Sequence, residues 1–131
     1  MHTSDKFALI GAGPMGLAMA KVLKEQGIAF DGFELHSDVG GLWDIEAPRS
    51  TMYESAHLIS SKTMTEFADF PMKAEVAEYP SHREMAQYFR DFADHFDLSS
   101  HYQFNTEGVQ VAPLWARGEG GTGESVERGE R

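Results

Sequence analysis

Three glycines in a fixed spacing, Gly11, Gly13 and Gly16, follow an apolar run and open a helical pattern. Gly11 allows a sharp turn, Gly13 leaves the backbone bare for a diphosphate, and Gly16 lets the helix lie close to the preceding strand. Free N–H groups and the helix dipole favour an anion at this end of a helix. The spacing therefore predicts a loop that holds a pyrophosphate.

An acidic residue stands where such a loop needs a second partner. Glu34 ends the next strand-like segment, residues 28–35. At this distance from the glycines, a carboxylate can accept hydrogen bonds from the hydroxyls of an adenosine ribose, and it would repel a 2′-phosphate. Strand, glycine turn, helix and strand-end acid together predict a dinucleotide site. The alternative is a glycine-rich connection with a strand-end carboxylate that binds no ligand.

The elements that must position these residues are those of an α/β fold. Four apolar residues, Phe7–Ile10, suit a central parallel strand covered on both faces, and a helix is expected from Pro14 to about residue 26. A second helix begins at a capping box formed by Ser81 and Glu84, and it carries a stripe of apolar side chains expected in the core. That stripe comprises Met85, Tyr88, Phe89, Phe92 and Phe96. Residues 102–106 and 109–111 read as further strands.

The composition of the chain argues against several classes of partner and site. The chain has 131 residues, a net charge of −10 and no cysteine. The negative field opposes nucleic acid and anionic membranes, whereas backbone N–H groups can still bind an anionic dinucleotide. Without cysteine there is no disulfide, thiol catalysis or cysteine-type zinc site, and the histidines show no metal-ligand spacing, so no metal is expected. With neither a signal peptide nor a membrane-spanning run, we expect a cytoplasmic protein with no membrane partner.

A second glycine turn follows the acid almost at once. Gly40 and Gly41 permit positive φ and close approach of the main chain to a ligand, and Trp43 can pack on that ligand. The alternative is a turn whose aromatic side chain closes the edge of the domain.

With this turn, the chain resembles the flavin-containing monooxygenases, which have a glycine loop, a strand-end Glu and a Gly-Gly-x-Trp turn in the same order. The resemblance covers residues 5–112 and continues through a set of downstream matches: Tyr53, Ser61, Lys62, Phe67, Asp69, Phe70, Pro71, Tyr79, Pro80, Ser81, His82, Arg83 and Glu84. It implies a Rossmann-like FAD/NAD(P)-binding domain over residues 1–112, with a parallel sheet and flanking helices, incomplete relative to the family. The implied ligand is FAD rather than NAD.

The resemblance also implies which residues bind the cofactor. The set lies along the glycine loop, the strand-end acid, the second turn, a segment near the flavin ring in relatives and a late strand: Gly11, Gly13, Pro14, Met15, Gly16, Glu34, Leu35, Gly41, Leu42, Trp43, Ser60, Ser61 and Val109. Because the flavin supplies the chemistry in this family, no catalytic side chain is assigned. Phe67, Asp69, Phe70 and Pro71 are interpreted as a structural turn.

The implied activity is that of a flavin-dependent, NADPH-using monooxygenase that inserts one oxygen atom from O₂ into a nitrogen-, sulfur- or carbonyl-containing small molecule. Relatives commonly have Asn where this chain has Ile59, and Ile cannot donate a hydrogen bond beside the flavin, so the usual oxygenation is in question. No second glycine loop for NADPH occurs in the sequence. Two alternatives stay open: an FAD-binding module truncated relative to the family and without turnover of its own, and another flavin oxidoreductase. The sequence gives neither the substrate nor the oligomeric state.

The end of the chain has a different composition. Residues 113–131 are rich in glycine and charge and poor in apolar side chains. Such a segment cannot bury enough apolar surface to offset the entropy of ordering, so we expect a disordered tail.

Overall fold

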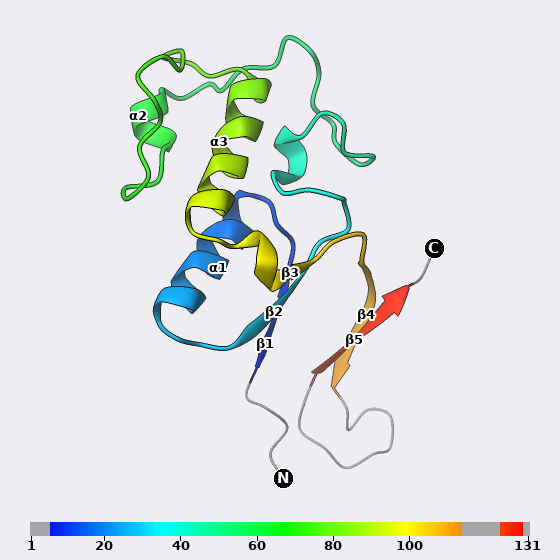
Figure 1. Ribbon diagram of the computed structural model, residues 1–131. Helices are drawn as coiled ribbons and strands as arrows, with labels where there is room; N and C mark the ends of the chain where they lie inside the picture. The colour runs from blue at the N-terminus through cyan, green and yellow to red at the C-terminus, as the bar shows by residue number, and fades with distance from the viewer. Residues whose placement is uncertain (1–5, 114–123, 130–131) are drawn as a thin grey trace.

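The computed structural model describes residues 6–113 and 124–129. Ten helices and strands follow one another along this part of the chain (Figure 1): β1 (Phe7–Ile10), α1 (Pro14–Glu25), β2 (Phe30–Phe33), η1 (Gly41–Trp43), α2 (Lys62–Thr65), α3 (His82–His95), η2 (Ser99–His101), β3 (Tyr102–Gln103), β4 (Glu107–Pro113) and β5 (Glu124–Gly129).

Three of the strands form a parallel sheet in the order β1-β2-β3. Phe7 pairs with Phe30 at one end of the sheet, and Phe33 pairs with Gln103 at the other. In Figure 1, α1 lies beside this sheet, and α3 stands above α1 with the long irregular segment around its amino-terminal half. Parallel strands linked through helices confirm the predicted α/β, Rossmann-like class.

The first strand differs from its prediction. We expected β1 to be central and covered on both faces, but it is the outer strand of the sheet, and Phe7 and Ile10 are 60% and 55% exposed. Among the described residues, β2 is the only strand that pairs with β1. An apolar run indicates that a strand is suited to burial. It does not indicate which strands or helices cover it.

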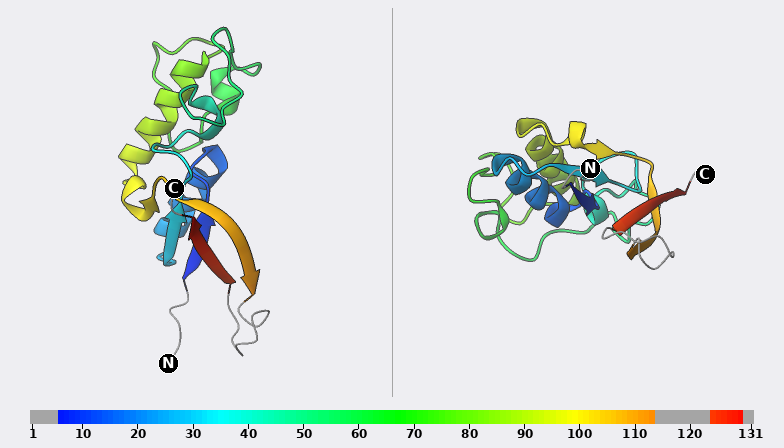
Figure 2. Two further views of the ribbon diagram at one scale, coloured as in Figure 1. Left: turned by 90° about the vertical axis from the view of Figure 1, so that its right-hand side faces the viewer. Right: turned by 90° about the horizontal axis from the view of Figure 1, so that it is seen from below.

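The later strands also differ from their prediction. Only Tyr102–Gln103 joins the parallel sheet, whereas the segment that contains Val109 belongs to β4 and forms an antiparallel hairpin with β5, with an irregular register between Gly108 and Val111. Figure 2 shows this hairpin extending away from the helical part. Residues 124–129, which lie within the expected disordered tail, form β5 and pair with β4. The disordered tail over residues 113–131 stays a prediction. Residues 114–123 and 130–131 lie outside the described residues.

The core forms around α3, as its pattern predicts. Four of the five side chains of the apolar stripe are buried, and Phe96 packs against them. Phe67 and Phe70 join the core through aromatic contacts with Tyr88 and Phe92, and Asp69 between them forms an ion pair with Lys21 of α1. The segment 67–71 is therefore a structural turn.

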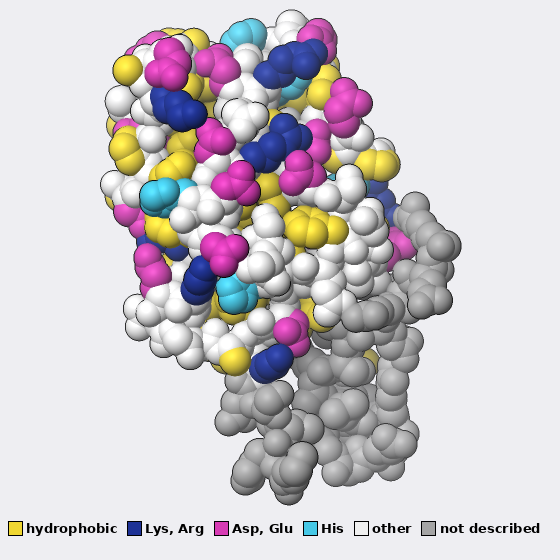
Figure 3. Space-filling view, viewed as in Figure 1, with side chains coloured by type: hydrophobic (Ala, Val, Ile, Leu, Met, Phe, Trp, Pro, Cys, Tyr) yellow, Lys and Arg dark blue, Asp and Glu magenta, His cyan; other side chains and the backbone are white. Residues whose placement is uncertain are grey.

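The surface carries charges of both signs. On the face seen in Figure 3, acidic and basic side chains lie next to one another over much of the molecule. No helix in the described part of the chain is long and apolar enough to cross a bilayer.

The capping box at the start of α3 is present. Ser81 Oγ accepts a hydrogen bond from the Glu84 N–H at 3.2 Å, and Glu84 Oε1 accepts from the Ser81 N–H at the same distance. The second Glu84 oxygen accepts from the Ala77 N–H at 3.0 Å, which ties the preceding loop to the helix.

These bonds give the stability of the protein a pH dependence. The Ala77 and Ser81 N–H groups lower the pKa of Glu84 from its ordinary 4.5. A lowered pKa in the folded state means that the contribution is present above pH 4.5 and is lost as pH falls through the folded-state pKa. We expect Glu84→Gln to lower the free energy of unfolding by about 1 kcal/mol at pH 7. Urea titrations at a series of pH values from 7 downward check this, because the difference from the parent should shrink as Glu84 is protonated in the folded protein.

Candidate functional site

The glycine loop is hydrogen-bonded to residues at the ends of two strands, β2 and β3. Gly11 has a φ of +103°, which favours glycine, and its N–H donates to the Phe33 carbonyl at 2.8 Å. The Tyr102 hydroxyl donates to the Gly11 carbonyl at 2.9 Å. Burial, and secondly the charge of Glu34, raise the pKa of Tyr102, so this hydroxyl stays protonated as a donor. The loop therefore has a fixed position at the carboxyl end of the sheet.

Gly16 is required by packing. A Cβ at this position would overlap the Gly11 carbonyl oxygen and lie 2.8 Å from the carbonyl carbon. Side-chain Cβ atoms are not found so close to backbone, so any other residue would push α1 away from β1. The predicted role of Gly16, to bring the helix close to the strand, agrees with this contact.

Gly13 has no comparable structural reason to be glycine. Its φ of −75° and ψ of −174° are open to any residue, and a Cβ would meet only the Gly41 Cα, at an ordinary 3.7 Å. Gly13 is the N-cap of α1 and provides no side-chain cap, while Pro14 fills the first turn. This helix start thus lacks the cap that α3 has, and the bare backbone at Gly13 suits the approach of an anion.

Glu34 lies directly behind the loop. It is 6% exposed, and Oε2 accepts from the Ala12 N–H at 2.6 Å while Oε1 accepts from the His36 N–H at 3.0 Å. These charge-assisted bonds join the end of β2 to the glycine loop. Each carboxylate oxygen keeps a further lone pair that a ligand hydroxyl could use.

Replacing this carboxylate tests its structural role. Glu34→Gln should lower the free energy of unfolding by about 1–2 kcal/mol, because the amide NH₂ would face a buried backbone N–H that loses its acceptor. Chemical denaturation in the absence of ligand measures this loss. Glu46→Gln, which changes the same group on an exposed residue, is the control and should unfold like the parent. If both variants unfold alike, Glu34 does not hold the loop.

The second glycine turn lies against the first. Gly40 and Gly41 have φ values of +117° and +56°, and the Gly40 N–H donates to the Ala12 carbonyl at 3.0 Å. A Cβ on Gly41 would come within 2.9 Å of the Gly13 Cα. Two stretches of backbone without side chains therefore meet at one edge of the sheet. They contain Gly13 and Gly41, which are 28 residues apart in sequence.

A cavity of about 360 Å³ opens beyond the end of β2. Its lining comes from three segments: Leu35, His36, Ser37, Pro48, Arg49, Asn105 and Glu107. Leu35 is the one residue of this lining that the sequence pattern predicts. Arg49 pairs with Glu107 at 2.9 Å, and the Asn105 N–H donates to the His36 carbonyl at 3.0 Å. Because these contacts join segments that are distant in sequence, no local pattern predicts them.

The other predicted site residues are placed as follows. Met15 and Leu42 are 81% and 49% exposed beside the two glycine turns, and Trp43 is partly buried against the core. Val109 belongs to the β4 hairpin.

Ser60 and Ser61 lie before α2 rather than at the glycine turns. Their hydroxyls bond Thr65 at 2.7 Å and Thr63 at 3.2 Å, and in the part of the chain that the structure describes neither bonds the glycine loop. Ile59 beside them is 98% exposed.

Comparison with known proteins decides the family. The sequence profile of the flavin-binding monooxygenase-like family matches residues 4–129. The chain belongs to this family. The match extends beyond the 5–112 over which the motifs are recognised, and it includes β5. Nothing in the spacing of residues 124–129 indicates this membership.

Individual relatives agree with the family. The chain is 37% identical over 112 residues to dimethylaniline monooxygenase [N-oxide-forming] 2 of Oryctolagus cuniculus, covering 82% of this chain and 21% of that protein. Among solved structures, S-allyl-L-cysteine S-oxygenase from Allium sativum superposes with a TM-score of 0.76 at 26% identity, over 92% of this chain and 34% of that one. OTEMO in complex with FAD and NADP superposes with a TM-score of 0.73 at 26% identity, over 87% and 21%. The chain thus spans about a fifth of the length of the flavin monooxygenase relative it matches.

Proposed function

We propose that this chain is the FAD-binding portion of a flavin-dependent, NADPH-using monooxygenase. The observation that carries the proposal is Gly13, a glycine that neither backbone conformation nor packing requires, at the uncapped start of α1. A bare backbone there serves a ligand rather than the fold. Family membership supports FAD as that ligand, and so does the FAD bound to OTEMO.

The residues present fit this cofactor. Gly11, Gly13 and Gly41 offer two apposed backbone turns to a pyrophosphate, and the first turn of α1 adds N–H groups and a favourable dipole. The free lone pairs of Glu34 would accept the ribose hydroxyls, and the cavity at Leu35 has room for part of the adenosine. Pro14, Met15, Leu42, Trp43, Ser60, Ser61 and Val109 stay as proposed contacts.

When bound, FAD would supply electron transfer and oxygen activation, with NADPH as reductant and a nitrogen-, sulfur- or carbonyl-containing small molecule as substrate. The residues of this chain would bind the cofactor, orient it and keep water from it. No side chain described here is assigned a proton-transfer role. The NADPH site, a cytoplasmic location and the absence of a membrane or nucleic-acid partner stay predictions.

An FAD-binding module without turnover of its own is the second candidate. It is favoured by Ile59, which stands where relatives commonly have Asn.

Oxygen uptake separates the two candidates. The FAD-loaded chain is mixed with NADPH in an oxygen electrode, with and without a tertiary amine or a thioether. Oxygen consumption that depends on both FAD and NADPH supports the monooxygenase. Bound FAD without oxygen consumption supports the module without turnover, and electron transfer only to another acceptor would support a different flavin oxidoreductase.

A further inference from the structure

We propose that Arg90 is a positioning residue that holds the Gly40–Gly41 turn in the shape that receives the cofactor. The inference rests on the proposed FAD binding. It concerns a contact between α3 and a turn some fifty residues earlier, which no sequence motif connects.

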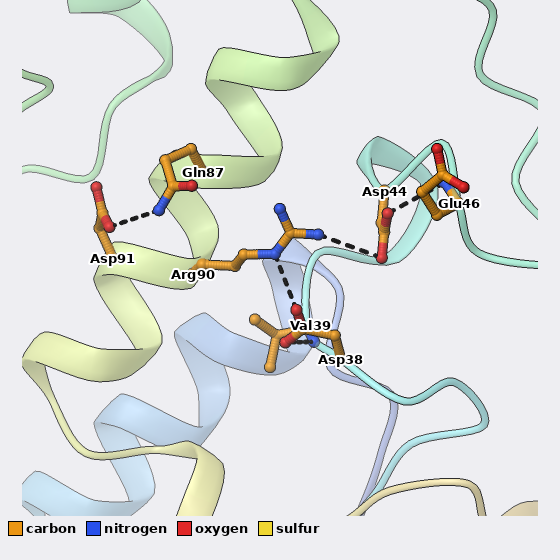
Figure 4. Close-up of polar contacts among 7 residues, drawn as sticks. All are labelled: Asp38, Val39, Asp44, Glu46, Gln87, Arg90 and Asp91. Carbon is orange, nitrogen blue, oxygen red and sulfur yellow. Dashed lines mark hydrogen bonds and ion pairs between the residues drawn. The ribbon is translucent and has the colours of Figure 1, made fainter.

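The contact consists of two ion pairs made by one guanidinium group. Arg90 Nε donates to Asp38 Oδ2 at 2.9 Å, and Nη2 lies 3.4 Å from Asp44 Oδ2 (Figure 4). Asp38 precedes the glycine pair and Asp44 follows it. Arg90 therefore bridges the two ends of the turn.

Each carboxylate also accepts a hydrogen bond from a nearby backbone N–H. Asp38 Oδ1 accepts from the Val39 N–H at 2.7 Å, and Asp44 Oδ1 accepts from the Glu46 N–H at 3.1 Å. One oxygen of each Asp is thus used locally and the other is used by Arg90. Through these bonds the position of the guanidinium is coupled to the main chain on both sides of Gly40 and Gly41.

A glycine pair needs such an external restraint. Two residues with positive φ and no side chain give the turn many accessible conformations, and its direct bond to the phosphate loop is the Gly40 N–H to Ala12 carbonyl contact. Gly41 must keep its place against Gly13 for both backbones to face one ligand. Fixing the turn before binding lowers the entropy cost of binding.

The same contact adds little to global stability. Arg90 is 34% exposed and Asp38 is 46% exposed, and the more buried Asp44, at 14%, lies at the longer distance of 3.4 Å from Arg90. Ion pairs with this exposure and spacing contribute weakly to folding. Loss of Arg90 should therefore act on cofactor affinity and on the local mobility of the turn, and leave unfolding almost unchanged. Arg83 gives a matched control, because it lies on the same helix and lines the same hollow as Arg90 but pairs with Glu54, at 2.6 Å, instead of Asp38 and Asp44.

The test compares Arg90→Gln with Arg83→Gln in three measurements: FAD affinity by flavin fluorescence titration, unfolding in urea, and amide hydrogen exchange of residues 39–46 without FAD. For Arg90→Gln we expect about three- to tenfold weaker FAD binding, faster exchange of the Gly40 and Asp44 amides and an unchanged unfolding midpoint. Arg83→Gln should match the parent in all three. Asp38→Asn combined with Arg90→Gln should lose no more affinity than Arg90→Gln alone, because the single variant already lacks the Asp38–Arg90 ion pair and the Asn side chain keeps an amide oxygen for the Val39 N–H.

Three outcomes would overturn the proposal: unchanged exchange in Arg90→Gln, faster exchange with unchanged FAD affinity, or equal losses in both Arg variants. If the parent protein itself binds no FAD, the proposed function fails. The exchange measurement still decides in that case whether Arg90 orders the turn.

Discussion

Alanine in place of Gly16 is expected to lower the free energy of unfolding by about 3 kcal/mol or more. The added methyl would overlap the Gly11 carbonyl oxygen. That carbonyl cannot move aside easily, because it accepts the Tyr102 hydroxyl and belongs to a residue whose N–H is bonded to Phe33. The first turn of α1 would have to separate from β1. Urea unfolding followed by far-ultraviolet circular dichroism measures the effect.

A control should not place alanine at Gly27, because the positive φ of Gly27 would add backbone strain of its own. A better control is Ala18→Gly in the same helix, which removes a methyl group and should cost only about 1 kcal/mol through helix propensity. A Gly16→Ala variant that unfolds at the parent's urea concentration would show that α1 and β1 are not in the close contact described.

Alanine in place of Gly13 should have the opposite profile. The fold tolerates a Cβ at this position, with a φ of −75° and the Gly41 Cα at an ordinary contact distance of 3.7 Å. A bound pyrophosphate would meet the added methyl, and overpacking of this kind costs about 1–3 kcal/mol, or roughly a 5- to 150-fold loss of FAD affinity. Flavin fluorescence titration measures the affinity, and the urea midpoint should stay near that of the parent.

Together the two glycine variants separate structure from binding within one loop. Gly16→Ala affects stability first, whereas Gly13→Ala affects FAD affinity alone. A Gly13→Ala protein that binds FAD as tightly as the parent would remove the loop from the cofactor site. If that variant unfolds instead, the bare backbone at Gly13 serves the fold, and the observation behind the proposed function is lost.

Local chemistry made much of the fold predictable. The apolar strand, the glycine turn and the helix that follows each depend on neighbouring residues, and the structure has them where the pattern predicts. The capping box of Ser81 and Glu84 and the buried stripe of α3 are local in the same sense, since they follow from spacing along one helix.

The remainder depends on partners distant in sequence. The exposure of Phe7 and Ile10 reflects which strands are present beside β1, and the strand at residues 124–129 reflects its pairing with β4. Neither can be read from the segment itself. The bridge from Arg90 to Asp38 and Asp44 joins a helix face to a turn, and helical spacing alone marks Arg90 only as a polar position.

Retention of FAD is the measurement that tests the central claim most directly. The protein is incubated with excess FAD, separated from free cofactor by gel filtration, and examined by visible absorption and circular dichroism. We expect the two-banded absorption of bound flavin in the protein peak, and a much weaker signal for Gly13→Ala. A folded protein that elutes without colour would contradict the account, because the two glycine turns and Glu34 would then be present without forming a working FAD site.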